Sequence, residues 1–486
     1  MSHALRRTSL SRALVGVLAL LCLFLPQNVA NAGPHEPGKI AAKVRADLKD
    51  GKATIWVRLK GEADLGAASR ATTKVAKTKA VYDAKTAYAN RSQAGLRALL
   101  TRRHAEFTPF WIVNAVKVTA DERLAEEIAA LPEVTSVEPV ATIEMPKEPK
   151  PKPGRARPKA ATGVEWNIDM VKAPQVWNDL HNRGEGIVIG VIDSGMDFTH
   201  PALIGSYRGT RADGSVDHNY NWFDAYEKCS APAPCDSNGH GTHVTGIAAG
   251  TGGIGVAPGA KWIGSNGCGH GCTTDGLVAT AQWMLAPTDL NGQNPRPELA
   301  PNVVNSSWGW GPGEAGVDFR DSVNTWITAG IFPVFANGNE GKTKPCDTSR
   351  HPGSYLETYS VGNLDSAGNV YDESSRGPGE NGDMKPNISA PGAQIRSSTP
   401  EGGYGLMTGT SQAAPHVAGA IALILSAAPS LRGNVSAIRT LLDDTAVDIP
   451  DTSCGGTADD NNVAGEGAMD VRAAVQAAPD DPLGDR

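Results

Sequence analysis

Short runs of consecutive apolar residues constrain the fold of this chain more than any other feature. The clearest run covers residues 187–192 (IVIGVI), and similar runs occur at residues 303–304 and 331–335. A strand that is apolar on both faces is typical of a parallel sheet covered by helices on both sides. Helices are predicted between glycine-rich turns at residues 240–249 and 412–427. This alternation indicates an α/β fold with a mostly parallel central sheet and functional residues at the carboxyl ends of its strands.

The first 32 residues have the pattern of a secretory signal peptide. Three arginines precede an apolar run at residues 13–25, and Ala30-Asn31-Ala32 matches an A-x-A cleavage site. A membrane anchor is the weaker interpretation, because the apolar run is short for a bilayer span and no second span follows. We therefore expect a secreted, extracellular protein without a membrane partner. A net charge of −7 over 486 residues gives no indication of a nucleic-acid partner.

Cysteine usage agrees with an oxidising compartment. Of seven cysteines, Cys22 lies in the signal, which leaves an even number in the mature chain. Six cysteines allow 15 connectivities, of which short loops favour the pairs Cys229–Cys235 and Cys268–Cys272, and this leaves Cys346 to pair with Cys454. The alternative at CGHGC, around His270, is a zinc site. Only three ligands stand there and no second cluster completes a site, so we expect a disulfide loop and no metal.

Residues 33–145 predict a small α+β domain, in which strands and helices alternate. Strands are expected at residues 53–59, 110–118 and 134–140, and helices at residues 72–103 and 121–131. The next segment, 146–162, is basic and rich in proline, which predicts an extended linker. The large α/β domain then covers residues 163–478, followed by a C-terminal tail, 479–486.

Three short motifs supply the parts of a nucleophilic acyl-transfer site. Asp193 in VIDSG follows a buried strand and can orient an imidazole. His240 in GHGTH starts a helix between glycines that leave its ring accessible, whereas His243 is expected to pack internally. Ser411 in GTSQAAPHVAG lies at a helix N-terminus, where N–H groups favour developing negative charge. Each residue alone has a structural alternative, an Asx turn for Asp193 or an N-cap for Ser411.

Together these blocks resemble the three signature blocks of subtilisin-family (subtilase) serine proteases, in the order of that family. The resemblance extends from residue 163 to about residue 475 and implies a subtilisin-like three-layer domain. It also implies Asp193 as the orienting acid, His240 as the general base and Ser411 as the nucleophile. The expected activity is that of a serine endopeptidase, which needs no cofactor.

Further site residues follow from the same resemblance. Asn339, in FANGNEG, matches the asparagine that donates into the oxyanion hole, and Asn337 is the alternative. Ser307, Trp308 and Gly309 resemble the segment that lines the substrate cleft as an edge strand. Trp308 and Trp310 stand where the family often has smaller residues, so we expect a narrower or flatter pocket. Gln412 replaces the methionine that usually follows the nucleophile, which should be tolerated.

The segment before the linker resembles the inhibitor-type propeptide of the family, with a ferredoxin-like α+β fold. The implied roles are folding assistance and intramolecular inhibition until cleavage. A cut within residues 153–163 and a cut nearer Ile143 are equally favoured. Calcium is a further possibility, since relatives often bind it and residues 459–462 are acidic and amide-rich, but no EF-hand pattern is present.

The sequence thus predicts a monomeric, secreted serine endopeptidase that is made as a zymogen and acts on proteins or peptides. The alternative from another class is a catalytically inactive subtilase scaffold used for binding. The presence of all three triad residues and of Asn339 disfavours it. An esterase or peptide ligase would use the same residues and differ only in the acceptor.

Overall fold

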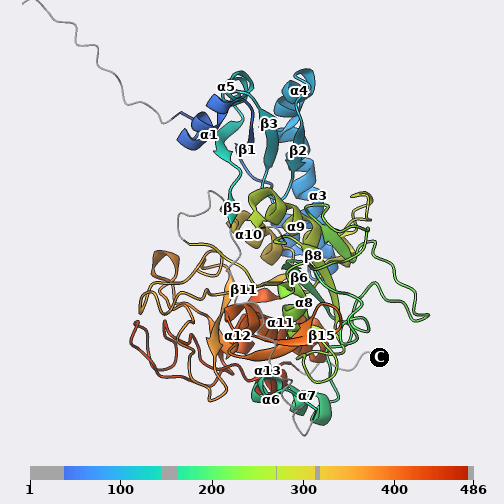
Figure 1. Ribbon diagram of the computed structural model, residues 1–486, viewed down its shortest axis with the longest axis vertical. Coiled ribbons are helices and arrows are strands. Elements are labelled where there is room, and N and C mark those ends of the chain that lie inside the picture. The colour runs from blue at the N-terminus through green and yellow to red at the C-terminus, as the bar shows by residue number, and fades with distance from the viewer. Residues whose placement is uncertain (1–37, 144–162, 270, 312–317, 480–486) are drawn as a thin grey trace, which may run out of the picture. The chain divides into compact units, whose positions relative to one another are not determined.

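A seven-stranded parallel sheet forms the centre of the computed structural model (Figure 1), which describes residues 38–143, 163–269, 271–311 and 318–479. All neighbouring strands in it run parallel, as expected for strands that are apolar on both faces. The α/β fold predicted from the apolar runs is therefore confirmed. In spatial order the strands are β13 (Ile388–Pro391), β12 (Tyr359–Leu364), β11 (Phe332–Ala336), β10 (Val303–Ser306), β6 (Val188–Asp193), β8 (Lys261–Asn266) and β7 (Trp222–Asp224).

Alternate residues of these strands enter two different cores. Val303 and Val334 lie in one cluster, and their chain neighbours Val304 and Phe335 lie in the other. Side chains along a strand point alternately to opposite faces, so both faces of the sheet are covered. The result is three layers, helix, sheet and helix.

The first face is covered by the two helices that begin at the His240 and Ser411 motifs, α8 (His240–Ala249) and α11 (Thr410–Ala427), which pack against each other. The second face is covered by α9 (Thr274–Leu285) and α10 (Arg320–Thr328). Helix α8 has the predicted bounds, whereas α11 begins two residues earlier than predicted. The remaining helices of this region are α6 (Trp166–Met170), α7 (Ala173–Asp179), α12 (Val435–Asp443) and α13 (Val471–Ala477).

The N-terminal region folds around a four-stranded antiparallel sheet in the order β2-β3-β1-β4. Its strands are β1 (Ala53–Leu59), β2 (Phe107–Phe110), β3 (Ala115–Ala120) and β4 (Val134–Pro139), and a short strand β5 (Thr142–Ile143) follows. Its helices are α1 (Ala42–Asp47), α2 (Gly66–Arg70), α3 (Lys74–Ser92), α4 (Ala94–Arg102) and α5 (Glu122–Ala129). Strands and helices alternate here as predicted.

Two predictions for this region were wrong in detail. The single strand expected at residues 110–118 is a hairpin, because the chain turns at residues 111–114 and Asn114 adopts a positive φ of 46°. The backbone N–H of Trp111 in that turn donates to Gln282 Oε1 on α9, a contact that local sequence does not reveal. The long helix expected at residues 72–103 is divided at Gln93 into α3 and α4.

The N-terminal sheet and the central sheet share a core. Trp56, Phe110 and Ile112 lie in the same apolar cluster as Leu277 of α9 and Trp326 of α10. The described residues from 39 to 479 accordingly belong to one compact unit. Lys117 on β3 also forms an ion pair of 2.7 Å with Asp275 on α9, which adds a polar contact between the N-terminal region and the helices that cover the central sheet.

The predicted signal peptide, linker and C-terminal tail lie outside the described residues, as does His270. Within the described ranges, no helix combines the length and the apolar character that a bilayer crossing requires.

Candidate active site

Asp193 and His240 meet at the carboxyl end of β6. His240 Nδ1 lies 2.7 Å from Asp193 Oδ1, and both side chains are buried, at 3% and 0% exposure. The approach requires glycine at position 241, because a Cβ there would lie 2.0 Å from the carbonyl oxygen of Gly195. With its Nδ1 proton donated to the carboxylate, the imidazole keeps Nε2 as its proton-accepting nitrogen. The pair therefore has the geometry of a general base and its orienting acid.

A second carboxylate, the half-buried Asp236, supports this pair and was not predicted as a site residue. Asp236 Oδ1 accepts hydrogen bonds from Ser194 Oγ at 2.9 Å and from Gly239 N at 2.8 Å. Asp236 Oδ2 accepts from the backbone N–H of Thr242 at 2.9 Å and from its hydroxyl at 2.6 Å. Burial raises the pKa of Asp236, while these hydrogen bonds oppose the increase. The carboxylate thus links the chain after Asp193 to the first turn of α8.

Ser411 lies in the first turn of α11 and is tied to the end of β10. Its Oγ donates to the carbonyl of Ser307 at 3.2 Å, and Ser307 Oγ donates to the carbonyl of Ser411 at 2.8 Å. The next residue, Trp308, donates its indole N–H to the carbonyl of Ile192, one residue before Asp193, at 2.9 Å. Since β6 and β10 are parallel neighbours, these bonds hold Ser411 at the same edge of the sheet as Asp193.

Asn339 follows β11 and lies against the start of α11. Its Oδ1 accepts from the backbone N–H of Thr410 at 2.8 Å and from the Thr410 hydroxyl at 2.9 Å. A carbonyl oxygen held by two donors leaves the amide nitrogen as the end that can donate to a ligand. Asn339, Thr410 and Ser411 line one small pocket of about 20 Å³, together with Gly309. By contrast, Asn337 is fully buried and donates to the carbonyl of Ser375 at 2.8 Å.

The two tryptophans beside Ser307 belong largely to the core. Trp308 and Trp310 are 2% and 1% exposed, and their rings stack with centroids 5.9 Å apart. The backbone of Trp310 pairs with that of His351 through hydrogen bonds of 2.7 and 2.8 Å. One edge of this segment is therefore already paired, and the indole rings fill the interior behind the small pocket.

His243, which the sequence placed inside the fold, is fully buried on α8. Its Nε2 lies 3.1 Å from the carbonyl of Ile395 and 3.2 Å from that of Gly405. Burial lowers its pKa to about 3, so the ring is neutral near pH 7. His243 is thus a structural donor, which leaves His240 as the histidine in contact with Asp193.

The six cysteines form three disulfides, Cys229–Cys235, Cys268–Cys272 and Cys346–Cys454. These are the pairs that the sequence favoured. With both cysteines of CGHGC oxidised, that loop has no thiolates for zinc. Among the described residues, no group of three or more histidine, cysteine or acidic side chains is arranged to hold a metal ion.

In the loop at residues 459–462, where calcium was a possibility, the side-chain oxygens of both asparagines accept hydrogen bonds within the protein. Asn461 Oδ1 accepts the backbone N–H groups of Val463 and Ala464, and Asn462 Oδ1 accepts that of Lys385. Calcium requires six to eight oxygen ligands, and these amide oxygens are already used within the protein.

The N-terminal region reaches the edge of this site. Strand β5 pairs antiparallel with β9 (Cys272–Thr273), with Ile143 opposite Cys272. The loop before β9 is hydrogen-bonded to Asp193, the candidate orienting acid. Gly267 N and Cys268 N both donate to the backbone carbonyl of Asp193, at 2.8 and 3.0 Å. An extended segment of the chain therefore lies on a strand adjacent to the site.

Comparison with known proteins gives a consistent result. Residues 184–469 match the family model described as the subtilase family, Peptidase_S8. The chain is 35% identical over 480 residues to Bacillopeptidase F of Bacillus subtilis strain 168. The aligned region covers 91% of this chain and 32% of that protein. It is 30% identical over 379 residues to Subtilisin E of the same strain, covering 76% of this chain and 82% of that protein. The chain thus spans about a third of Bacillopeptidase F but most of Subtilisin E.

Proposed function

Because the chain belongs to the subtilase family of serine endopeptidases, peptidase S8, we propose that it is a secreted endopeptidase made as a zymogen. It hydrolyses peptide bonds in proteins or peptides through Asp193, His240 and Ser411. The observation that carries the proposal is the buried 2.7 Å hydrogen bond between His240 and Asp193, at the sheet edge to which Ser411 is tied.

In the proposed reaction, Ser411 Oγ attacks the scissile carbonyl carbon while His240 Nε2 accepts its proton. His240 then gives this proton to the leaving amine, and the acyl group stays on Ser411 as an ester. A water molecule, deprotonated by His240, hydrolyses the ester and restores the serine. Asp193 holds the ring through Nδ1 and stabilises the imidazolium that forms in both steps. Side chains and water suffice for this chemistry, and no cofactor takes part.

Asn339 is the proposed oxyanion donor. Its amide oxygen is held by Thr410, so its N–H₂ group is oriented before substrate arrives. A donor fixed in this way stabilises the tetrahedral oxyanion more than the ground-state carbonyl, which lowers the barrier. In subtilisin, a relative of this chain, removal of one such donor lowers kcat about 10²–10³-fold.

Residues 33–145 are the proposed propeptide. Three contacts support this role: the core shared with α9 and α10, the ion pair of Lys117 with Asp275, and the pairing of β5 with β9. By adding a strand beside the site, β5 occupies the edge along which an extended substrate would pair. Cleavage beyond Ile143 would separate this segment from the enzyme, and the basic linker would then be lost or shortened. Secretion is proposed from the signal pattern in residues 1–32, and the mature enzyme is proposed to be a monomer.

The proposal is tested by expressing the full chain with and without Ser411→Ala. The unsubstituted protein should release its N-terminal segment, hydrolyse casein and react covalently with a fluorophosphonate, and Ser411→Ala should do none of these. The matched control is Ser426→Ala on the same helix, since Ser426 lies far along α11 and its Oγ donates to the carbonyl of Glu185 at 3.0 Å. A folded, unsubstituted protein that neither cleaves itself nor reacts with the probe would instead favour the inactive binding scaffold.

A further inference from the structure

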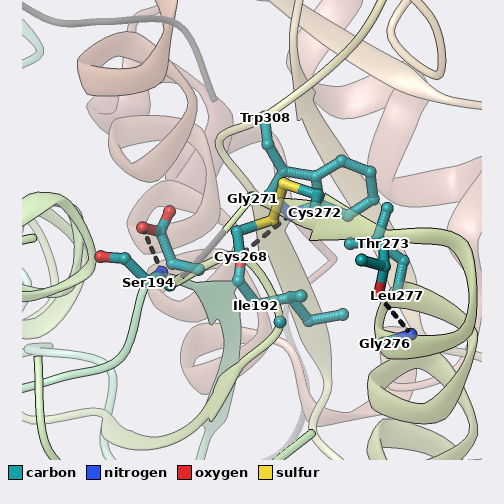
Figure 2. Close-up of a disulfide and its surroundings, with 12 residues drawn as sticks. Ile192, Ser194, Cys268, Gly271, Cys272, Thr273, Gly276, Leu277 and Trp308 are labelled. Atoms are coloured by element: carbon teal, nitrogen blue, oxygen red, sulfur yellow. Dashed lines mark hydrogen bonds between the residues drawn. A yellow bond between two sulfur atoms is a disulfide. The ribbon is translucent and has the colours of Figure 1, made fainter. Parts of the chain in front are cut away.

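The Cys268–Cys272 disulfide closes a loop that joins the active site to β9. Figure 2 shows this disulfide with Ser194 on one side, Thr273, Gly276 and Leu277 at the start of α9 on the other, and Ile192 and Trp308 next to it. At its start the loop donates two backbone hydrogen bonds to the carbonyl of Asp193, and it ends at Thr273, which lies opposite Thr142 of β5. Its conformation therefore decides whether the strand edge at β9 is aligned with the catalytic groups.

One side chain from a distant part of the sequence contacts both ends of this loop. The hydroxyl of Tyr226, just after β7, lies 2.7 Å from the carbonyl of Gly267 and 3.1 Å from that of Gly271. It also accepts the backbone N–H of Thr273 at 3.0 Å. A hydroxyl has one proton to donate and two lone pairs, so it can serve a carbonyl and an N–H at once.

The surroundings of this hydroxyl are shaped to receive it. Gly276, in the first turn of α9, lies so near that a Cβ there would be 2.5 Å from Tyr226 Oη. Asn266 fixes the start of the loop from the other side, because its Oδ1 accepts Gly269 N at 2.9 Å and its Nδ2 donates to Asp224 Oδ1 at 3.0 Å. Burial raises the pKa of Tyr226, so the hydroxyl keeps its proton at neutral pH.

We propose that Tyr226 and the Cys268–Cys272 disulfide are positioning groups that hold residues 267–269 and 271–273 in the register in which β9 pairs with an extended substrate. This inference rests on the proposed endopeptidase function and assigns residues to its substrate selection. Tyr226 does not touch the reacting atoms. It acts through the backbone of Gly267, Gly271 and Thr273, and its contribution depends on how far the substrate extends along β9.

The test uses the self-matured protein and a series of p-nitroanilide substrates with one, two and four residues before the same scissile bond. Tyr226→Phe should raise KM for the four-residue substrate about 3- to 10-fold, as expected for the loss of hydrogen bonds of ordinary strength. The kcat values, KM for the one-residue substrate and the rate of fluorophosphonate labelling should stay unchanged. The double variant Cys268→Ala/Cys272→Ala should show the same length dependence with a larger amplitude.

Tyr207→Phe is the matched control. This substitution also removes the hydroxyl of a buried tyrosine. The Tyr207 hydroxyl lies 3.0 Å from His218 Nδ1 and away from the disulfide loop. The KM of this variant should be the same as that of the parent at every substrate length. If Tyr226→Phe fails to mature, Gly276→Ala provides the second variant, because its methyl group displaces the hydroxyl and should raise KM in the same length-dependent way.

Three outcomes would overturn the inference. An equal KM for parent and Tyr226→Phe at every length would exclude a positioning role. A fall in kcat of the same size for the shortest and longest substrates would indicate a general structural role instead. If the unsubstituted protein fails to label with fluorophosphonate, the proposed function fails and this inference fails with it, whereas normal labelling confines a negative result to Tyr226.

Discussion

The two sides of Ser411 are held by different kinds of groups. On the side of the proposed general base, two carboxylates are the acceptors, the buried Asp193 for His240 and the half-buried Asp236 for the chain around it. On the side of the proposed oxyanion donor the holding groups are neutral, since Asn339 is held by the backbone and hydroxyl of Thr410. The difference follows from the proposed reaction. A positive charge forms on the imidazole and is stabilised by a carboxylate, whereas the negative charge forms on the substrate and requires only oriented N–H dipoles.

The strongest test of this comparison neutralises the carboxylate that contacts the imidazole. Asp193→Asn keeps the shape of the side chain but removes the charge that stabilises the imidazolium and fixes its tautomer. Loss of the equivalent carboxylate in subtilisin lowers kcat about 3 × 10⁴-fold, and we expect an effect of that order. Steady-state kinetics on a short peptide substrate should show the loss in kcat with KM little changed. The comparison breaks if Asp236→Asn lowers kcat as much as Asp193→Asn does.

On the neutral side, Asn339→Ala should lower kcat about 10²–10³-fold with little change in KM, the magnitude known for subtilisin.

The contribution of Thr410 can be separated from that of Asn339 itself. Thr410→Val removes the hydroxyl that holds Asn339 Oδ1 and should lower kcat by less, whereas Thr410→Ser keeps the hydroxyl and should remain close to the parent. Equal effects of Val and Ser at this position would contradict an orienting role for the hydroxyl.

Asp236→Asn is expected to act on stability more than on chemistry. In the native protein both carboxylate oxygens of Asp236 accept hydrogen bonds. The asparagine places an N–H₂ group at one of these positions, so a donor such as Thr242 N loses its acceptor. Such a loss costs about 1–3 kcal/mol in the free energy of unfolding. Urea unfolding in the inactive Ser411→Ala background measures it without self-cleavage. The control is Asp213→Asn in an exposed turn, where little change in the free energy of unfolding is expected.

The smallest effect concerns Lys74, a buried lysine outside the site that also contacts a neutral group. Lys74 at the start of α3 donates to the carbonyl of Ala300. Burial, together with the charge of Arg208, lowers the pKa of Lys74 from 10.5 to about 7. Between about pH 7 and pH 10.5 the unfolded chain holds a proton on Lys74 that the folded chain has released. The free energy of unfolding therefore rises with pH across this window, and below pH 7 the contribution is constant.

The measurement is the difference in unfolding free energy between Ser411→Ala and Ser411→Ala/Lys74→Met at pH 7, 8 and 9. The difference should change in favour of the lysine protein by at most about 1.4 kcal/mol per pH unit. A difference that is independent of pH would mean that Lys74 stays protonated in the folded chain.

Local sequence was sufficient where a motif carries both the residue and its geometry. Asp193 directly follows its strand, His240 begins α8 where glycines bracket it, and the cysteine pairs include two that close short loops. Contacts between distant segments were not predictable in this way. Tyr226 reaches Gly267 across 41 positions of sequence, and the turn before Asn114 is fixed by Gln282 of α9. Asp236 has a weaker local signal, an acidic residue four positions before His240 that precedes a glycine-bracketed helix start.

Pro415 changes the hydrogen bonding of the first turn of α11. A proline has no backbone N–H, so the carbonyl four residues before it, that of Ser411, receives no helical hydrogen bond. Ser307 fills this vacancy from the end of β10. The helix therefore has one internal hydrogen bond fewer at Ser411 and one hydrogen bond more to the sheet, so that movement of α11 along its axis is coupled to the end of β10.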